Sequence, residues 1–132
     1  GGELRELSKV ISGGELSRLM LAIKSIISKQ NILPTVIFDE IDNGVSGDIA
    51  AKVGNIMRKM SEERQLLAIT HLPQIAAKAE QHFFVSKISD SKQTRSLIKQ
   101  LNKEERIEEI AKMLSNEKIS ASALETAKEL MN

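Results

Sequence analysis

The amino-acid sequence predicts an α/β fold in which helices flank a mostly parallel sheet. Apolar residues recur at three- and four-residue steps over residues 12–28 and again over residues 49–60, which indicates two amphipathic helices. Short runs of consecutive apolar residues at 36–38 and 66–69 indicate strands of the kind that sheets bury. Because such helices and strands alternate along the chain, we expect a layered α/β domain with parallel strands.

The remainder of the chain predicts a C-terminal β-hairpin followed by helices. Pro73 suits the first turn of a short helix that ends near residue 79. Residues 83–85 and 96–98 form two apolar runs, which we expect to pair as an antiparallel hairpin through a turn at residues 90–92. Residues 102–105, Asn-Lys-Glu-Glu, have the form of a capping box that opens a helix, and a last helix carries Leu124, Ala127, Leu130 and Met131. We expect residues 1–132 to form a single domain.

The composition limits the classes of protein to which this chain can belong. Of the 132 residues, 41% are hydrophobic and 28% charged, which is typical of a folded globular chain. Lys and Arg total 19 against 18 for Asp and Glu, so the basic excess typical of nucleic-acid-binding domains is missing and charge does not support DNA contact by this segment. The absence of cysteine excludes disulfides and thiolate metal sites, and no apolar run approaches the ~18 residues of a membrane span. We therefore expect a cytoplasmic protein without a membrane partner.

The most informative motif is the stretch Ser12-Gly13-Gly14-Glu15, which opens the first predicted helix. One interpretation is a capping box, in which Ser12 and Glu15 satisfy the first backbone N–H groups of the helix. That interpretation leaves the glycines unexplained, because each Gly in a helix costs up to ~1 kcal/mol relative to Ala. A helix N-terminus without Cβ atoms is also a site for an anionic phosphate. From the residues alone, phosphate binding and plain capping remain equally open.

Two carboxylates, Asp39 and Glu40, follow the first predicted strand directly. Ligands of open α/β sheets lie at the carboxyl ends of the strands, so this position is suited to a site. One carboxylate can hold Mg²⁺, directly or through water, and the next can orient or deprotonate an attacking water. The alternative, that both residues only solvate a strand end or cap the next helix, carries about equal weight.

His71 ends the second predicted strand, a position at which a lone histidine is more often structural than catalytic. If the two strands are neighbours, His71 would lie near Glu40, where its imidazole could hydrogen-bond a phosphate or the attacking water. Ser46 and Gly47, in the loop after the carboxylates, are most simply interpreted as a helix cap. His82 has no evident partner and receives no role.

A phosphate-cradling P-loop is missing from this sequence. Such a loop ends in Gly-Lys-Ser/Thr, and none of the seven glycines is followed by Lys. The main grip on the β- and γ-phosphates of a nucleotide must therefore come from another segment. Together with the first motif falling at residue 11, this predicts that the chain is part of a larger domain.

Taken in order and spacing, these residues resemble the C-terminal half of an ABC ATPase head in the SMC-like branch. Ser12 to Glu15 resembles the signature motif, residues 36–40 the Walker B strand, Ser46 the D-loop position and His71 the switch histidine. Within that branch the sequence is most similar to the RecN family of bacterial double-strand-break repair proteins. Three stretches carry the similarity, residues 11–24, 37–47 and 70–76, and the helical tail at 110–114 extends it.

The resemblance implies a role for each motif. Asp39 would support Mg²⁺, and Glu40 would act on the attacking water. Ser12, Gly13 and Gly14 would contact the γ-phosphate of ATP held by a second head, with Glu15 as part of the same nucleotide-binding motif, and His71 would sense that phosphate. Many ABC proteins carry Asp at the D-loop position, so Ser46 argues against a D-loop mechanism based on a carboxylate.

The resemblance also implies the partners. ATP and Mg²⁺ would be bound together with the N-terminal half of the same head, which carries the P-loop, and with a second head in a homodimer. DNA would be contacted through the full-length protein at the nucleoid. The chain alone would not hydrolyse ATP, and it would be marginally stable or self-associating. Two alternatives stay open: the head of another SMC-like or ABC ATPase, and a non-enzymatic α/β interaction module.

Overall fold

The computed structural model describes residues 22, 34–39, 42, 45–89, 93–115 and 119–132. The chain divides into two compact units, Gly1–Ile75 and Ala76–Asn132, and each is considered by itself. The predicted helix at residues 12–28 lies outside the described residues, except for Ala22. None of the helices in the described ranges is both long and apolar enough to cross a membrane.

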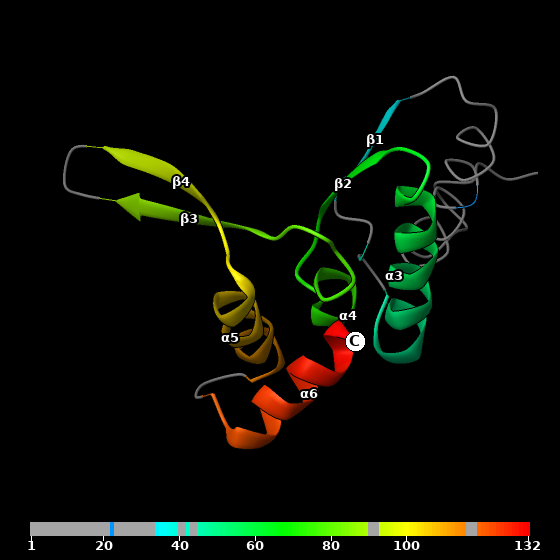
Figure 1. Cartoon of the computed structure of the whole chain (residues 1–132). Coiled ribbons are helices and arrows are strands. Elements are labelled where there is room, and N and C mark those ends of the chain that lie inside the picture. Colours follow the sequence, from blue (N-terminus) through cyan, green and yellow to red (C-terminus); the bar gives the residue numbers. More distant parts are fainter. Residues whose placement is uncertain (1–21, 23–33, 40–41, 43–44, 90–92, 116–118) are drawn as a thin grey trace, which may run out of the picture. The chain divides into compact units, whose positions relative to one another are not determined.

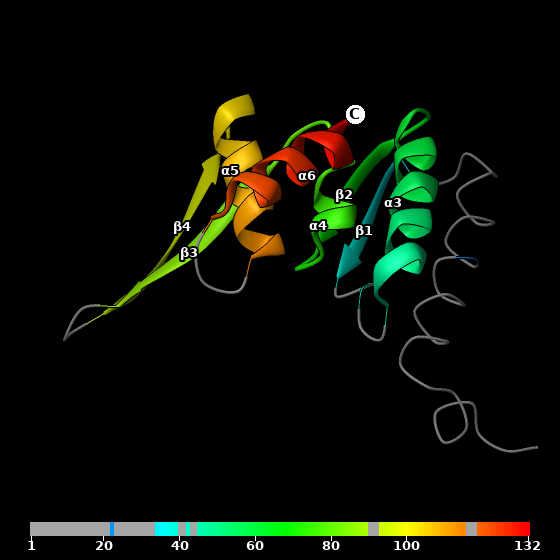
Figure 2. The same ribbon diagram turned by 90° about the horizontal axis from the view of Figure 1, so that it is seen from below.

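The first unit is built on a β–α–β arrangement. Strand β1 (Thr35–Asp39) runs parallel to strand β2 (Gln65–Ile69), with Thr35 opposite Gln65 and Asp39 opposite Ile69. Helix α3 (Gly47–Ser61) connects the two strands and lies along the pair in both ribbon views (Figures 1 and 2). The predicted helix and the predicted parallel strands are confirmed, and the two strands are neighbours.

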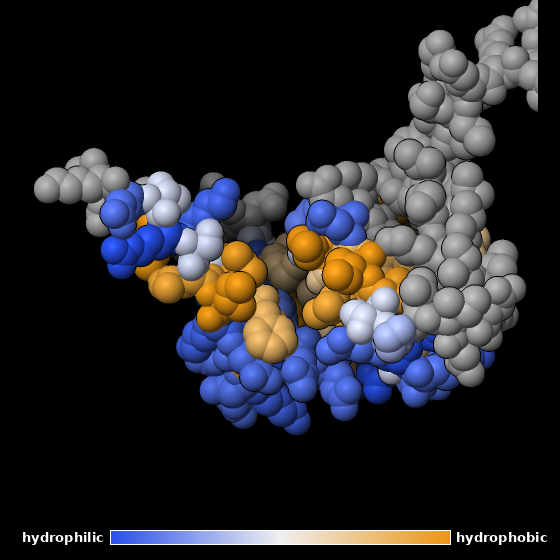
Figure 3. All heavy atoms as spheres, turned by 90° about the horizontal axis from the view of Figure 1, so that it is seen from above, coloured by the Kyte–Doolittle hydropathy of each residue, from blue (hydrophilic) through white to orange (hydrophobic). Residues whose placement is uncertain are grey.

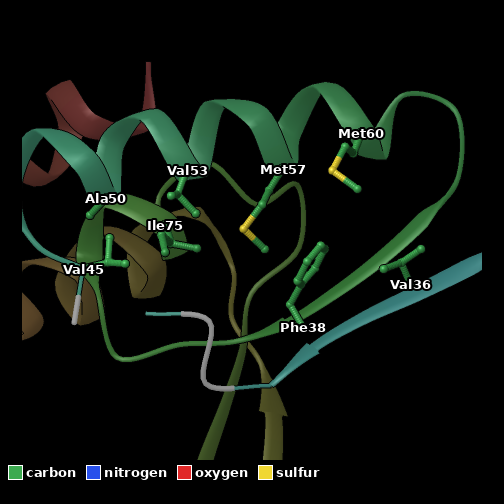
Figure 4. Packing of buried hydrophobic residues seen from close by; sticks show 8 residues of the cluster. All are labelled: Val36, Phe38, Val45, Ala50, Val53, Met57, Met60 and Ile75. Carbon is green, nitrogen blue, oxygen red and sulfur yellow. The ribbon is translucent and has the colours of Figure 1, made fainter. Parts of the chain in front are cut away.

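A hydrophobic core fills the space between α3 and one face of this strand pair. Phe38 at its centre is 1% exposed, and Val36 on the same strand face is 6% exposed. Figure 4 shows Phe38 pointing toward Met57 of the helix, whereas Val36 lies on the side of Met60. The spacing of the helical residues, which places Ala50, Val53, Gly54, Met57 and Met60 on one buried stripe, explains why this face of α3 meets the sheet.

No segment in the described ranges covers the opposite face of the strand pair. Ile37, Leu67 and Ile69 alternate with the core residues along the strands and are 56%, 44% and 59% exposed. The prediction that both strands are buried is therefore wrong for this face. Consecutive apolar residues are typical of parallel strands covered on both sides, and here α3 supplies only one cover.

The second unit contains the hairpin and the two last helices. The short helix α4 (Pro73–Ala76) crosses the boundary between the units and ends earlier than predicted. Strands β3 (Phe83–Ser89) and β4 (Thr94–Gln100) pair antiparallel as a separate sheet, which confirms the hairpin, although its turn at 90–92 lies outside the described residues.

Helices α5 (Lys103–Leu114) and α6 (Ala121–Met131) pack against each other (Figure 2). Their contact is made by Ile110 and by alanines that allow close approach, and Ile110, Ala111 and Ala127 are each 0% exposed. The predicted capping box is confirmed: Asn102 Oδ1 accepts from the Glu105 amide, and Glu105 Oε2 accepts from the Asn102 amide.

The hairpin exposes apolar side chains on both of its faces. Partners in the register share a face, so Val85 and Ile98 lie on one face and Phe84 and Leu97 on the other. All four are more than a third exposed, and apolar surface is visible along the hairpin in Figure 3. A two-stranded hairpin is at best marginally stable alone in water, which is consistent with the expected self-association.

His82, which received no role from the sequence, is a half-buried structural residue. Its carbonyl accepts a hydrogen bond from the Leu101 amide at 2.9 Å, and its Nδ1 is buried without a hydrogen-bond partner. Arg106 nearby donates to the carbonyl oxygens of Ala79 and Glu80 at 2.6 and 3.0 Å. Burial lowers the pKa of the His82 imidazole, the Arg106 charge lowers it further, and Glu109 acts in the opposite direction.

This environment predicts that acid destabilises the second unit through His82. In the unfolded chain the ring binds a proton near pH 6.5, whereas the folded ring binds it only at lower pH. The unfolded state therefore binds more protons in this window, and stability falls as the pH drops below about 6.5. Urea unfolding at pH 7.5 and 5.5 should show a smaller pH dependence in His82→Gln than in the wild type. An unchanged difference between the two pH values would contradict this assignment.

Candidate functional site

The carboxyl ends of β1 and β2 bring two predicted site residues to one edge of the sheet. Because the strands are parallel and Asp39 lies opposite Ile69, the residues that follow Ile69 leave the sheet at the same edge as the Asp39 carboxylate. His71 is the second of these residues, and its side chain is 71% exposed. The sequence predicted a role for His71 only if its strand lies next to the strand that ends in Asp39. The parallel pairing of β1 and β2 meets this condition.

Asp39 itself lies on the uncovered face of the strand pair. It alternates with the buried Phe38 and shares its face with Ile37, and its side chain is exposed. An exposed carboxylate at a strand end fits Mg²⁺ bound largely through phosphate oxygens and waters. Within the described ranges no group of three or more His, Cys, Asp or Glu residues forms a ligand set for a metal ion. Asp39 is therefore suited to one ligand position and not to a complete protein cage.

Asp42 is the residue that the sequence interpretation missed. It is 2% exposed, although it lies in the loop between β1 and α3. Its Oδ2 accepts a hydrogen bond from the Thr70 hydroxyl at 2.5 Å and from the His71 amide at 2.7 Å. The same oxygen lies 3.0 Å from His71 Nδ1. The carboxylate thus ties the loop that follows the first strand to the loop that follows the second.

Hydrogen bonding keeps the Asp42 carboxyl ionised. Burial raises its pKa, but the Thr70 hydroxyl, the His71 amide, its own backbone amide and the His71 ring together lower it, and the net pKa lies below the ordinary value. Thr70 is held in turn, because its Oγ1 accepts from the Leu72 amide at 3.0 Å. Asp42 is 28 to 29 residues away from its partners in the sequence. No local sequence pattern could therefore predict this contact.

Ser46 is the N-cap residue of α3 by position. Its backbone is extended, and its side chain is exposed and makes no capping hydrogen bond. The interpretation of Ser46 as a helix cap is therefore correct for its backbone conformation, but its hydroxyl makes no capping hydrogen bond. Gly47 follows with φ of +54°, a left-handed conformation that favours glycine. Ser12, Gly13, Gly14, Glu15 and Glu40 lie outside the described residues.

Comparison with solved structures identifies the class of fold. The chain superposes with a TM-score of 0.65, over 87% of its own length and 68% of the other, on a chain from a study of ATP-driven dimerization and DNA-stimulated activation of SMC ATPases. Sequence identity is 24%. The fold is that of the C-terminal lobe of an SMC-like ATPase head. No protein-family model matches the chain.

The sequence relatives share one name. DNA repair protein RecN of Rickettsia conorii is 45% identical over 96% of the chain, that of Bacillus subtilis 45% over 99%, and that of Vibrio cholerae 44% over 99%. The chain is thus similar to RecN proteins over nearly its whole length, and it spans 23–24% of the length of these relatives.

Proposed function

We propose that this chain forms the C-terminal half of the ATP-hydrolysing head of a RecN-type protein that acts in repair of DNA double-strand breaks. The observation that carries the proposal is the shared edge of β1 and β2, where Asp39 and the loop bearing His71 meet beside an uncovered apolar face. The names of the relatives and the fold of the SMC ATPase chain support the same assignment.

Each site residue at this edge of the sheet has a separate role in the proposal. Asp39 holds Mg²⁺, directly or through water, and Glu40, the next residue, orients or deprotonates the attacking water. His71 contacts the terminal phosphate or that water from the neighbouring loop. Mg²⁺, when bound with ATP, neutralises charge on the phosphates. The exposed hydroxyl of Ser46 occupies the D-loop position and provides a hydrogen-bonding group without a charge.

Two partners complete the site in this proposal. The N-terminal half of the same head supplies the P-loop and covers the face formed by Ile37, Leu67 and Ile69, beside which Asp39 lies. Ser12, Gly13 and Gly14 contact the γ-phosphate of ATP on a second head, at a helix N-terminus suited to an anion, and Glu15 belongs to the same motif. ATP binding would then favour dimerisation of the heads, and DNA would be engaged by the full-length protein.

The experiment that tests the proposal measures ATP hydrolysis by this chain alone and after it is mixed with the separately produced P-loop half. We expect turnover only in the mixture, and we expect it to disappear when the chain carries Glu40→Gln. Turnover by the chain alone would contradict the split site. A mixture that associates, as sedimentation would report, but does not hydrolyse ATP would favour a non-enzymatic module.

A further inference from the structure

The contact between Asp42 and His71 restricts how the histidine can act. Two hydrogen bonds and one close ring contact converge on Asp42 Oδ2: the Thr70 hydroxyl and the His71 amide donate to it, and His71 Nδ1 lies 3.0 Å away. An ionised carboxylate has only lone pairs to offer, so an Nδ1 atom 3.0 Å away is favoured in its protonated form. The backbone amide of His71 and one nitrogen of its ring thus both lie against the same oxygen, which favours one orientation of the ring.

The free side of the ring is the side that could meet a nucleotide. Nε2 lies across the imidazole from Nδ1, and the His71 side chain is 71% exposed whereas that of Asp42 is 1% exposed. The buried partner therefore anchors one nitrogen, and the other remains available at the edge shared with Asp39. The proton on Nδ1 leaves Nε2 of the neutral ring as an acceptor, suited to a water proton. When the ring is protonated, Nε2 donates, which suits a phosphate oxygen.

We propose that Asp42 is a positioning residue for the reaction, which holds His71 as the Nδ1–H tautomer and presents Nε2 to the nucleotide. This inference rests on the proposed function, because it takes the role of His71 at the ATP site as given. It adds the residue that sets the tautomer and the orientation, and it states which nitrogen makes the contact. Asp42 touches neither phosphate nor water in this scheme and acts only through His71.

A spectroscopic measurement on the 132-residue chain tests the tautomer without ATP. The chain holds two histidines, so ¹⁵N-labelled histidine gives two pairs of ring signals, and His82→Gln assigns them. We expect the neutral ring of His71 to be protonated at Nδ1 in the wild type and to lose that preference in Asp42→Ala. Protonation at Nε2 in the wild type would overturn the proposal, whether or not the variant folds.

A double-mutant cycle, measured by the kinetics of the complete ATPase, tests whether Asp42 acts through His71. Misplacement of a catalytic group by about 1 Å can cost ~10²-fold, so Asp42→Ala should lower kcat by about that factor with little change in KM. The double variant Asp42→Ala/His71→Ala should be no slower than His71→Ala alone, since a positioning residue has nothing left to position. Multiplied losses in the double variant would overturn the proposal.

A failure of the proposed function can be distinguished from a failure of the inference about Asp42. If His71→Ala hydrolyses ATP normally while the wild-type ring is protonated at Nδ1, the proposed role of His71 at the ATP site is wrong. If His71→Ala is inactive but Asp42→Ala retains normal kcat, His71 has its role and the inference about Asp42 is wrong. Thr70→Val, which removes one donor to Asp42 and leaves the His71 contacts in place, should retain more activity than Asp42→Ala.

Discussion

Replacement of Glu40 by Gln in the complete ATPase is expected to lower ATP turnover by ~10²–10⁴-fold, the usual cost of removing a general base. The amide has nearly the shape of the carboxylate but cannot take a proton from water. ATP binding should therefore persist, and ATP-bound dimers of the head should accumulate because hydrolysis no longer separates them. Steady-state phosphate release and equilibrium binding of a fluorescent ATP analogue measure the two effects separately.

Glu62→Gln provides the matched control for this experiment. Glu62 is an exposed carboxylate at the C-cap of α3, so the substitution makes the same chemical change away from the sheet edge. We expect turnover to stay at the wild-type rate in this variant. Turnover of Glu40→Gln within a few-fold of wild type would show that Glu40 is not the base, and the carboxylate pair would then return to the alternative role of solvating a strand end.

Replacement of Phe38 by Ala is expected to destabilise the first unit by about 3–5 kcal/mol. Phe38 is among the largest fully buried side chains of the described residues, and it packs against Val53 and Met57 of α3. Its removal leaves a cavity between the helix and the strand pair that the neighbouring side chains can fill only in part. Because typical domains are stable by only ~5–15 kcal/mol, the loss is large enough to unfold a marginal unit.

The adjacent residue on the same strand gives the control for this prediction. Ile37 is 56% exposed on the uncovered face, so Ile37→Ala in the isolated chain should change stability by ~0.5 kcal/mol or less. Phe38→Leu, which removes less volume, should fall between the two and keeps the comparison possible if the Ala variant does not fold. Denaturant unfolding measures all three, and equal losses for Phe38→Ala and Ile37→Ala would contradict the observed core.

The order of helices and strands was determined by the sequence alone. The spacing of Val53, Met57 and Met60 predicted α3, and the residues at 102–105 predicted the capping box that the structure contains. These features are local, because a helix stripe or a cap depends on residues three or four positions apart. The similarity of short motifs to those of the RecN family was equally readable from the sequence, since the motifs are contiguous.

The tertiary structure decided what distant segments do to each other. Asp42 received no role from the sequence, and only the fold brings it to Thr70 and His71, 28 to 29 residues away. Likewise, the apolar runs of β1 and β2 predicted burial, but the structure shows one face packed under α3 and the other exposed. The physical reason is the same in both cases. Burial and long-range hydrogen bonds depend on which surfaces of the protein come into contact. The apolar residues of a strand indicate that its faces are to be buried, but they do not specify which segment packs against each face.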